Sequence, residues 1–241
     1  MKDIEKKIRT LFDYRQLPWL IKQCQLPATF IDSLIQLQTK IYVLDKYIEK
    51  NWVIDEPHLA DLAQAIKEEL HKLGYNELDI NKLLGSFAIY LKRELAIREG
   101  GYPSEVPIED FYLHKSCDVK LHRKVIADRS ATYIFNDEDW TTFDLITEVN
   151  DDIEDLVEDT LSINGNRLLF SLNLKPKNEL FNEYQRFIEH LKHLCAKIEN
   201  PHIGSLARQE LRQAELKLSN LFNEFENLKP GYRLAFLEAG L

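Results

Sequence analysis

The chain has 241 residues, of which 44% are hydrophobic and 10% aromatic, and this is enough apolar surface to build a globular core. Its formal net charge of −9 at pH 7 disfavours binding to nucleic acid or to an anionic membrane surface, because both partners require a basic face. A cationic partner or a bound metal ion fits this charge better.

Apolar residues recur every three to four positions through most of the chain, and only eight Gly and eight Pro interrupt them. We therefore predict an all-α fold, a single helical bundle of about eight to nine helices. The expected long helices lie at residues 2–13, 29–50, 57–74, 77–99, 107–127, 138–160, 177–199 and 202–228. A shorter apolar segment starts at Asn166 and stops before Pro176.

The strongest break in this pattern is Gly100-Gly101, which is followed by Pro103 and Pro107. We interpret residues 100–107 as a loop within one all-α domain that spans residues 1–241. No internal repeat or low-complexity tract divides the sequence further.

Cysteine usage and the N-terminal sequence predict a protein of the reducing cytoplasm. Cys24, Cys117 and Cys195 are odd in number and far apart, which argues against a disulfide framework and against a thiolate zinc site. The first seven residues lack the apolar segment of a signal peptide, and no apolar run approaches the roughly 20 residues that span a bilayer. We therefore expect a cytoplasmic chain without a membrane span.

Residues 130–166 form an unusually acidic stretch, with eleven Asp and Glu and no Lys, Arg or His. On a helix at residues 138–160, a rotation of about 100° per residue places a row of acids opposite an apolar stripe. The row consists of Asp144, Glu148, Asp151, Asp155 and Asp159. Like charges four residues apart repel by roughly a few tenths of a kcal/mol per pair, so either water or cations must face this row. The helix is therefore either a solvated surface or a binding site.

Short carboxylates at i, i+4 and i+8 offer the hard oxygen ligands that Mg²⁺ accepts while it bridges to a phosphate. A DDxxD motif is present at Asp151-Asp152-Ile153-Glu154-Asp155, and with Asp159 it resembles the metal-binding motif of class I isoprenoid synthases, the all-α trans-prenyltransferases and terpene synthases. The resemblance implies a class I isoprenoid synthase-like bundle in which Asp151, Asp155 and Asp159 bind Mg²⁺, with Asp152 beside them as a further candidate ligand. The chain departs from the family at position 155, where Ser or Thr is usual, and at position 159, where Glu is usual.

The resemblance also implies cationic groups that bind the diphosphate of the substrate. Terpene synthases often carry an Arg-Tyr pair near the C-terminus that closes over the diphosphate, and this chain has Tyr232-Arg233 at a similar separation in the reversed order. Arg123, Arg167 and Lys115 are further candidates for neutralising diphosphate oxygens. The alternative for each of these three residues is a charge that faces solvent or an ion pair with the acidic helix.

The family holds its metal ions between two acidic helices, but this chain contains no second DDxxD. Asp45 and Glu49 have the i, i+4 spacing of metal ligands on the expected helix 29–50, and Asp118 on the expected helix 107–127 is another candidate ligand. Ordinary surface charge is the alternative for all three.

These patterns favour an Mg²⁺-dependent enzyme that acts on an isoprenyl diphosphate, as a transferase in prenyl transfer or as a lyase in terpene cyclisation. Two alternatives stay open: a non-enzymatic all-α interaction protein with a solvated acidic helix, and an all-α nucleotide pyrophosphohydrolase. A homodimer is also left open. His190 and His193 lie one turn apart without an evident third metal ligand, and we interpret them as surface histidines.

Overall fold

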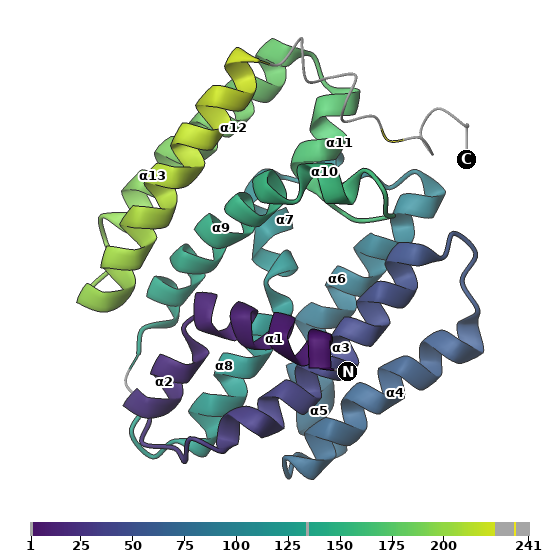
Figure 1. Ribbon diagram of the computed structural model, residues 1–241, viewed down its shortest axis with the longest axis vertical. Helices are drawn as coiled ribbons and strands as arrows, with labels where there is room; N and C mark the ends of the chain where they lie inside the picture. The colour runs from purple at the N-terminus through teal and green to yellow at the C-terminus, as the bar shows by residue number, and fades with distance from the viewer. Residues whose placement is uncertain (1, 134, 225–233, 235–241) are drawn as a thin grey trace. The chain divides into compact units, whose positions relative to one another are not determined.

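The computed structural model describes residues 2–133, 135–224 and 234, and Figure 1 shows the arrangement of the helices. The described residues form thirteen α-helices, two short 3₁₀ helices and no strand, which confirms the prediction of an all-α fold. Within these ranges, no helix combines the length and the apolar composition that crossing a bilayer requires.

The contacts between residues group the chain into two compact units. Unit 1 combines Met1–Tyr90 with Cys117–Ile134, and unit 2 combines Leu91–Ser116 with Phe135–Leu241. The loop expected at residues 100–107 therefore lies inside unit 2. The interpretation of the chain as a single domain stays a prediction.

Unit 1 is built around one long helix, α3. Its helices are α1 (Lys2–Tyr14), α2 (Leu17–Gln23), α3 (Phe30–Lys50), α4 (Glu56–Lys72), α5 (Glu77–Leu83), the first part of α6 (Gly85–Ala96) and α8 (Cys117–Arg129). Helix α3 packs against α1, α2, α4 and α8. Its buried residues, Leu34, Ile35, Leu37, Gln38, Ile41, Leu44 and Ile48, follow the three- and four-residue spacing of an amphipathic helix.

Unit 2 is built around α9, which carries the acidic stretch. Besides the end of α6, it contains the 3₁₀ helices η1 (Ile97–Glu99) and η2 (Pro103–Glu105), and the α-helices α7 (Ile108–Lys115), α9 (Asp137–Glu154), α10 (Leu156–Asp159), α11 (Arg167–Leu174), α12 (Lys177–Cys195) and α13 (Pro201–Asn223). Helix α9 packs against α7, α11, α12 and α13, while α12 and α13 lie side by side (Figure 1). This enclosure explains why α9 is buried on several sides, polar residues included.

Polar side chains fix the starts of α9 and α13. The side chain of Asn136 accepts a hydrogen bond from the backbone N–H of Glu138 at 2.9 Å and so caps α9. The carboxylate of the buried Asp139 accepts from the backbone N–H groups of Glu199 at 3.2 Å and Asn200 at 2.9 Å. The start of α9 is thereby tied to the turn that precedes α13.

The number of helices exceeds the predicted eight to nine because several expected helices are interrupted. The expected helix 107–127 is divided at Ser116 into α7 and α8, and the expected helix 138–160 is divided at Asp155 into α9 and α10. Ser and Asp compete for backbone hydrogen bonds, but neither is as strong a breaker as Gly or Pro. Helix α2 was also missed. Pro18 lies in its first turn, where proline is well tolerated, so this proline does not prevent a helix.

Both turns that border α2 contain a non-glycine residue in the left-handed conformation: Gln16 has φ 62° and Gln25 has φ 55°. After α2, the backbone N–H groups of Gln25 and Leu26 donate to the carbonyl oxygens of Lys22 and Ile21, each at 3.1 Å. This is a Schellman-type helix end, whose left-handed position is usually glycine. A side chain in this conformation costs roughly 1–2 kcal/mol.

We expect Gln25→Gly to raise the free energy of unfolding by about 0.5–1 kcal/mol, because the relief of the left-handed strain exceeds the entropy that glycine adds to the unfolded chain. The matched control is Gln23→Gly at the last position of α2, where glycine should lower stability by about 0.5–1 kcal/mol. Urea unfolding of the full chain measures both changes. A loss of stability in both variants would contradict the prediction.

Candidate functional site

The acidic row of unit 2 is largely enclosed by protein. Asp144, Glu148 and Asp159 are buried, Asp151 is half-buried, and only Asp155 among the five is exposed. A face directed at solvent would show the opposite distribution. The row therefore differs from the outer side of an ordinary amphipathic surface helix.

The three aspartates expected to bind metal keep their one-turn spacing across the interruption of the helix. The backbone N–H of Asp155 donates to the carbonyl oxygen of Asp151 at 2.9 Å, and that of Asp159 donates to Asp155 at 2.8 Å. These i→i−4 bonds carry the helical register from α9 into α10. A helical wheel of the expected helix 138–160 places Val157 in the apolar stripe opposite the acidic row, but Val157 is 63% exposed, so the predicted stripe is wrong at this position.

The carboxylate of Asp152 is fully buried and is held by three donors from unit 2. Its Oδ1 atom is in a short ion pair with the ammonium group of Lys115 at the end of α7. Its Oδ2 atom accepts from the hydroxyl of Tyr112 at 2.9 Å and from the backbone N–H of Leu168 at 3.3 Å. Metal ligation by Asp152 would require one of these protein donors to leave.

Asn166 connects Asp159, the last member of the acidic row, to the backbone of Asp152. Its Nδ2 atom lies 2.7 Å from the carbonyl oxygen of Asp152 and 2.9 Å from Oδ2 of Asp159, and its Oδ1 atom caps α11 by accepting from the N–H of Leu169 at 2.9 Å. The preceding Gly165 donates its N–H to the carboxylate of Glu94 at 3.1 Å, and a Cβ atom at this position would overlap that carboxylate. A side chain at position 165 would therefore displace the Glu94 carboxylate and its hydrogen bond to the turn before α11.

Lys115 lies in the field of several carboxylates of the acidic row. Burial alone would lower the pKa of Lys115, but Asp152, Glu148 and Asp159 together raise it well above its usual value. The ammonium group is therefore charged at neutral pH. Burial also raises the pKa of Asp159 to about 6, although Lys115 and Asn166 oppose the rise.

A chain of polar groups continues from Asp152 into the core of unit 2. The hydroxyls of Tyr112 and Tyr184 are 3.0 Å apart, and Tyr112 donates to Asp152, so the Tyr184 hydroxyl donates to Tyr112. Burial and then the Asp152 charge raise the pKa of Tyr112, which keeps this hydroxyl protonated as a donor. This chain ties α12 to the Asp152–Lys115 pair.

Arg167, expected to bind diphosphate, is 1% exposed and is engaged within the protein. Its guanidinium lies 2.6 Å from the carboxylate of Glu183 and 2.9 Å from the carbonyl oxygen of Val106. Lys175 binds the second oxygen of Glu183 at 2.8 Å. Burial would raise the pKa of Glu183, but the two cations outweigh it and lower the pKa. A role of Arg167 on a diphosphate stays a prediction.

The remaining sequence candidates lie in unit 1 or outside the described residues. On α3, Asp45 is half-buried, and Glu49 is ion-paired at 2.8 Å with a lysine of the same helix. On α8, Asp118 accepts a hydrogen bond from Gln38 at 2.8 Å, and Arg123 is buried. Metal or diphosphate binding by these four residues stays a prediction.

Tyr232 and Arg233 lie outside the described residues, so their expected role over the diphosphate stays a prediction. The next residue, Leu234, is 1% exposed, and its backbone N–H donates to the side-chain oxygen of Asn173 at 3.3 Å. Leu234 is therefore attached to unit 2 near the end of α11.

Sequence reasoning missed the residues that hold Asp152 and Asp159 in place, namely Tyr112, Asn166 and Tyr184. Asn166 had a usable signal, because an Asn before an apolar segment is typical of a helix cap. The two tyrosines had none, since nothing in a sequence tells a buried hydroxyl with a charged partner from one that faces water.

Among the described residues, no three or more His, Cys, Asp and Glu side chains are gathered as ligands of one metal ion. Mg²⁺ at phosphate-binding sites usually keeps several waters and is held by one or two carboxylates together with phosphate oxygens. Asp151, Asp155 and Asp159 therefore do not converge on one metal position, and one or two of their carboxylates would fit Mg²⁺ in donor chemistry if a diphosphate completes the coordination.

The comparisons with known proteins gave no match: no family model fits the chain, and no curated protein or solved structure is detectably similar to it. The resemblance to class I isoprenoid synthases rests on the DDxxD motif and its surroundings, and it stays a prediction.

Neutralising Asp152 or Asp155 compares how much the buried and the exposed residue of the DDxxD motif each contribute to the free energy of unfolding. We expect Asp152→Asn to lower the free energy of unfolding by about 3 kcal/mol, because it leaves the Lys115 charge buried without its ion-pair partner. Asp155→Asn, which removes an exposed charge from an acidic surrounding, should change stability by less than about 0.5 kcal/mol or raise it slightly. Urea unfolding of the two variants tests this, and equal losses would contradict the assignment of Asp152 as a buried anchor.

Asp159 should give unfolding a specific pH dependence in the absence of divalent cations. Its pKa is about 6 in the folded protein and about 3.9 in an unfolded chain. The folded state binds this proton more tightly, so the contribution of Asp159 to stability is complete below pH about 4 and is lost as the pH rises through about 6. Relative to the wild type, Asp159→Asn should therefore gain up to about 3 kcal/mol between pH about 4 and about 7. A pH-independent difference between the two proteins in urea unfolding would refute this.

Proposed function

We propose that the chain is an Mg²⁺-dependent enzyme that acts on an isoprenyl diphosphate, by prenyl transfer or by terpene cyclisation. The observation that carries the proposal is the row of Asp151, Asp155 and Asp159, which keeps one-turn spacing through two backbone hydrogen bonds although the helix is interrupted between its members. Carboxylates in this arrangement suit a cation that binds together with phosphate oxygens.

The side chains of the row differ in how they could contribute. Asp151 and Asp155 are the more accessible members and are the metal ligands that we expect to engage first, whereas Asp159 is buried and tied to Asn166. Bound Mg²⁺ would neutralise the diphosphate and so assist its departure from an allylic carbon.

Lys115 supplies a fixed positive charge beside the row. Its ammonium group is held by Asp152, which in turn is held by Tyr112 and Leu168. A cation positioned in this way can pair with diphosphate oxygens without the entropy cost of ordering a flexible side chain. Asp152 thus contributes as a positioning residue for Lys115, while its neighbours in the DDxxD motif bind metal.

The alternative of a solvated acidic helix is less well supported, because three of the five acids in the row are buried. Burying carboxylates is costly unless cations or hydrogen-bond donors compensate for it. An interaction protein would gain nothing from burying them. A nucleotide pyrophosphohydrolase would use the same donor chemistry, and the substrate test below separates the two enzymes.

Thermal unfolding of the full chain with Mg²⁺ and farnesyl diphosphate tests the proposal. Ligand present at about 100 times its Kd should stabilise the folded protein by about 2.7 kcal/mol, which appears as a rise in Tm. The double variant Asp151→Asn/Asp155→Asn should lose this rise. The control Asp137→Asn/Glu138→Gln removes the same charge from the other end of α9 and should retain it.

Two outcomes would overturn the proposal. One is the absence of any Mg²⁺-dependent Tm rise with geranyl, farnesyl and geranylgeranyl diphosphate. The other is release of pyrophosphate from a nucleoside triphosphate by a protein that does not respond to prenyl diphosphates, which would assign the row to a pyrophosphohydrolase.

A further inference from the structure

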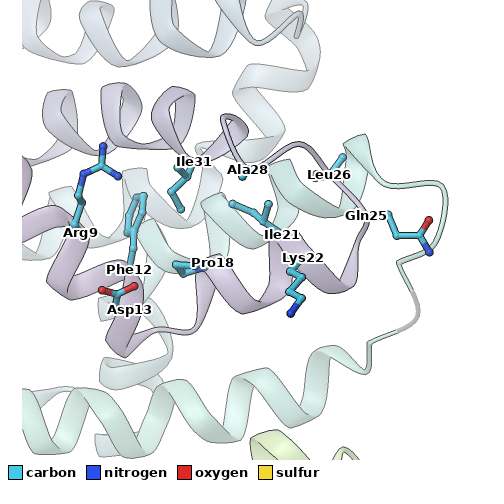
Figure 2. A pocket seen from close by; sticks show the side chains of 10 residues that line it. All are labelled: Arg9, Phe12, Asp13, Pro18, Ile21, Lys22, Gln25, Leu26, Ala28 and Ile31. Atoms are coloured by element: carbon cyan, nitrogen blue, oxygen red, sulfur yellow. The ribbon is translucent and has the colours of Figure 1, made fainter.

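Unit 1 contains a cavity of about 650 Å³ between α1, α2 and the start of α3. Helices α1 and α2 contribute residues spaced by about one helical turn, and α3 contributes Ile31. Phe12 on α1, Ile21 on α2 and Ile31 are the main apolar members. Figure 2 shows Phe12 beside Arg9 and Asp13 at one end of the group, Ile31 and Ile21 further along it, and Lys22 and Gln25 toward the other end. The volume falls within the range of about 300–1,000 Å³ that is usual for small-molecule sites.

The floor of the cavity is apolar and firmly supported. Phe12 and Ile21 are only 1% and 3% exposed. The ring of Phe12 meets the edge of His122 with 5.0 Å between centroids, and Nε2 of His122 lies 2.6 Å from Oε1 of Gln38. Burial lowers the pKa of His122 to about 3, so this ring is neutral and the floor carries no charge. A rigid apolar floor favours an apolar ligand group, since little ordering is needed on binding.

The two ends of the cavity differ in charge. At one end Arg9 is engaged by two acids, with its Nη2 atom 2.8 Å from Glu5 and 3.1 Å from Asp32, and Asp13 adds a further carboxylate. At the other end Lys22 is exposed, and no hydrogen bond or ion pair joins its side chain to another described residue. No acidic residue lines the cavity beside Lys22. An anionic head group is therefore favoured at the Lys22 end and disfavoured at the Asp13 end.

We propose that this cavity binds a small amphipathic carboxylate, with the carboxylate at Lys22 and the apolar chain along Ile21 and Phe12. The proposal concerns residues of unit 1 alone and does not depend on the function proposed for unit 2. It assigns a second ligand site to the chain, distinct in chemistry from the carboxylate row.

Isothermal titration calorimetry of the full chain with decanoate tests the site, with decanol as the uncharged probe of equal length. Decanoate should bind more tightly than decanol and with a negative heat-capacity change, the mark of apolar burial. Ala28→Trp, an exposed lining position where the indole would fill the cavity, should weaken decanoate binding at least about tenfold. The control Thr29→Trp adds the same group at the next position, which is exposed and does not line the cavity, and should bind normally.

Lys22→Gln tests the head-group assignment, with Lys7→Gln on the exposed part of α1 as the matched control. Removing a solvent-exposed charge contact should weaken decanoate binding about threefold and leave decanol unchanged. If Ala28→Trp disturbs the fold, Leu26→Trp fills the same cavity from another side. Absence of decanoate binding, binding that survives a filled cavity, or equal effects of Lys22→Gln on decanoate and decanol would each overturn the proposal.

Discussion

The buried ion pair between Asp152 and Lys115 is the interaction on which unit 2 depends. Asp152 has no exposed surface, and its carboxylate collects donors from α7 and α11, while the Tyr112 hydroxyl extends the same network to Tyr184 on α12. Desolvating two charges is expensive, and the expense is offset only when geometry and additional hydrogen bonds are both good. Helices α7, α11 and α12 therefore have to be in place for the pair to be tolerated, which couples their packing around α9 to a single carboxylate.

This constraint divides the DDxxD motif into two functions. Neighbouring residues on a helix point about 100° apart, so Asp151 and Asp152 cannot face the same partner. Asp152 points into the core, where it anchors Lys115, while Asp151 and Asp155 stay at least partly accessible. The DDxxD motif thus contains one buried residue, Asp152, and two more accessible ones, Asp151 and Asp155. Asp152 places the Lys115 ammonium group beside the accessible carboxylates. The carboxylates proposed to hold a metal and the ammonium group proposed to meet the phosphate are in this way fixed by the same interaction.

The sequence was sufficient for the all-α fold and for most of the long helices, because the three- and four-residue apolar spacing is a local property of each segment. It was insufficient at Ser116 and Asp155, where helices end without Gly or Pro, and at α2, a short helix with Pro18 in its first turn. The candidate site could likewise be predicted only in part from the sequence. The row of acids follows from a helical wheel, but the burial of Asp152 depends on Lys115 and Tyr112, which are 37 and 40 positions away in the chain. No pattern within α9 carries that information.

The acidic row also lies where a helix is least able to stabilise it. Asp151 and Asp155 are at the C-terminal end of α9, where the helix dipole is negative and favours cations over carboxylates. Lys115 and Asn166 compensate in part, yet burial still raises the pKa of Asp159 to about 6. The folded chain therefore pays electrostatically for keeping these carboxylates together. A divalent cation that binds the row would offset the unfavourable helix dipole, the repulsion between the carboxylates and the cost of their desolvation. The larger these unfavourable terms are in the free protein, the larger is the stabilisation that the cation gives. The instability of the row and its proposed affinity for metal are two consequences of the same arrangement of charge.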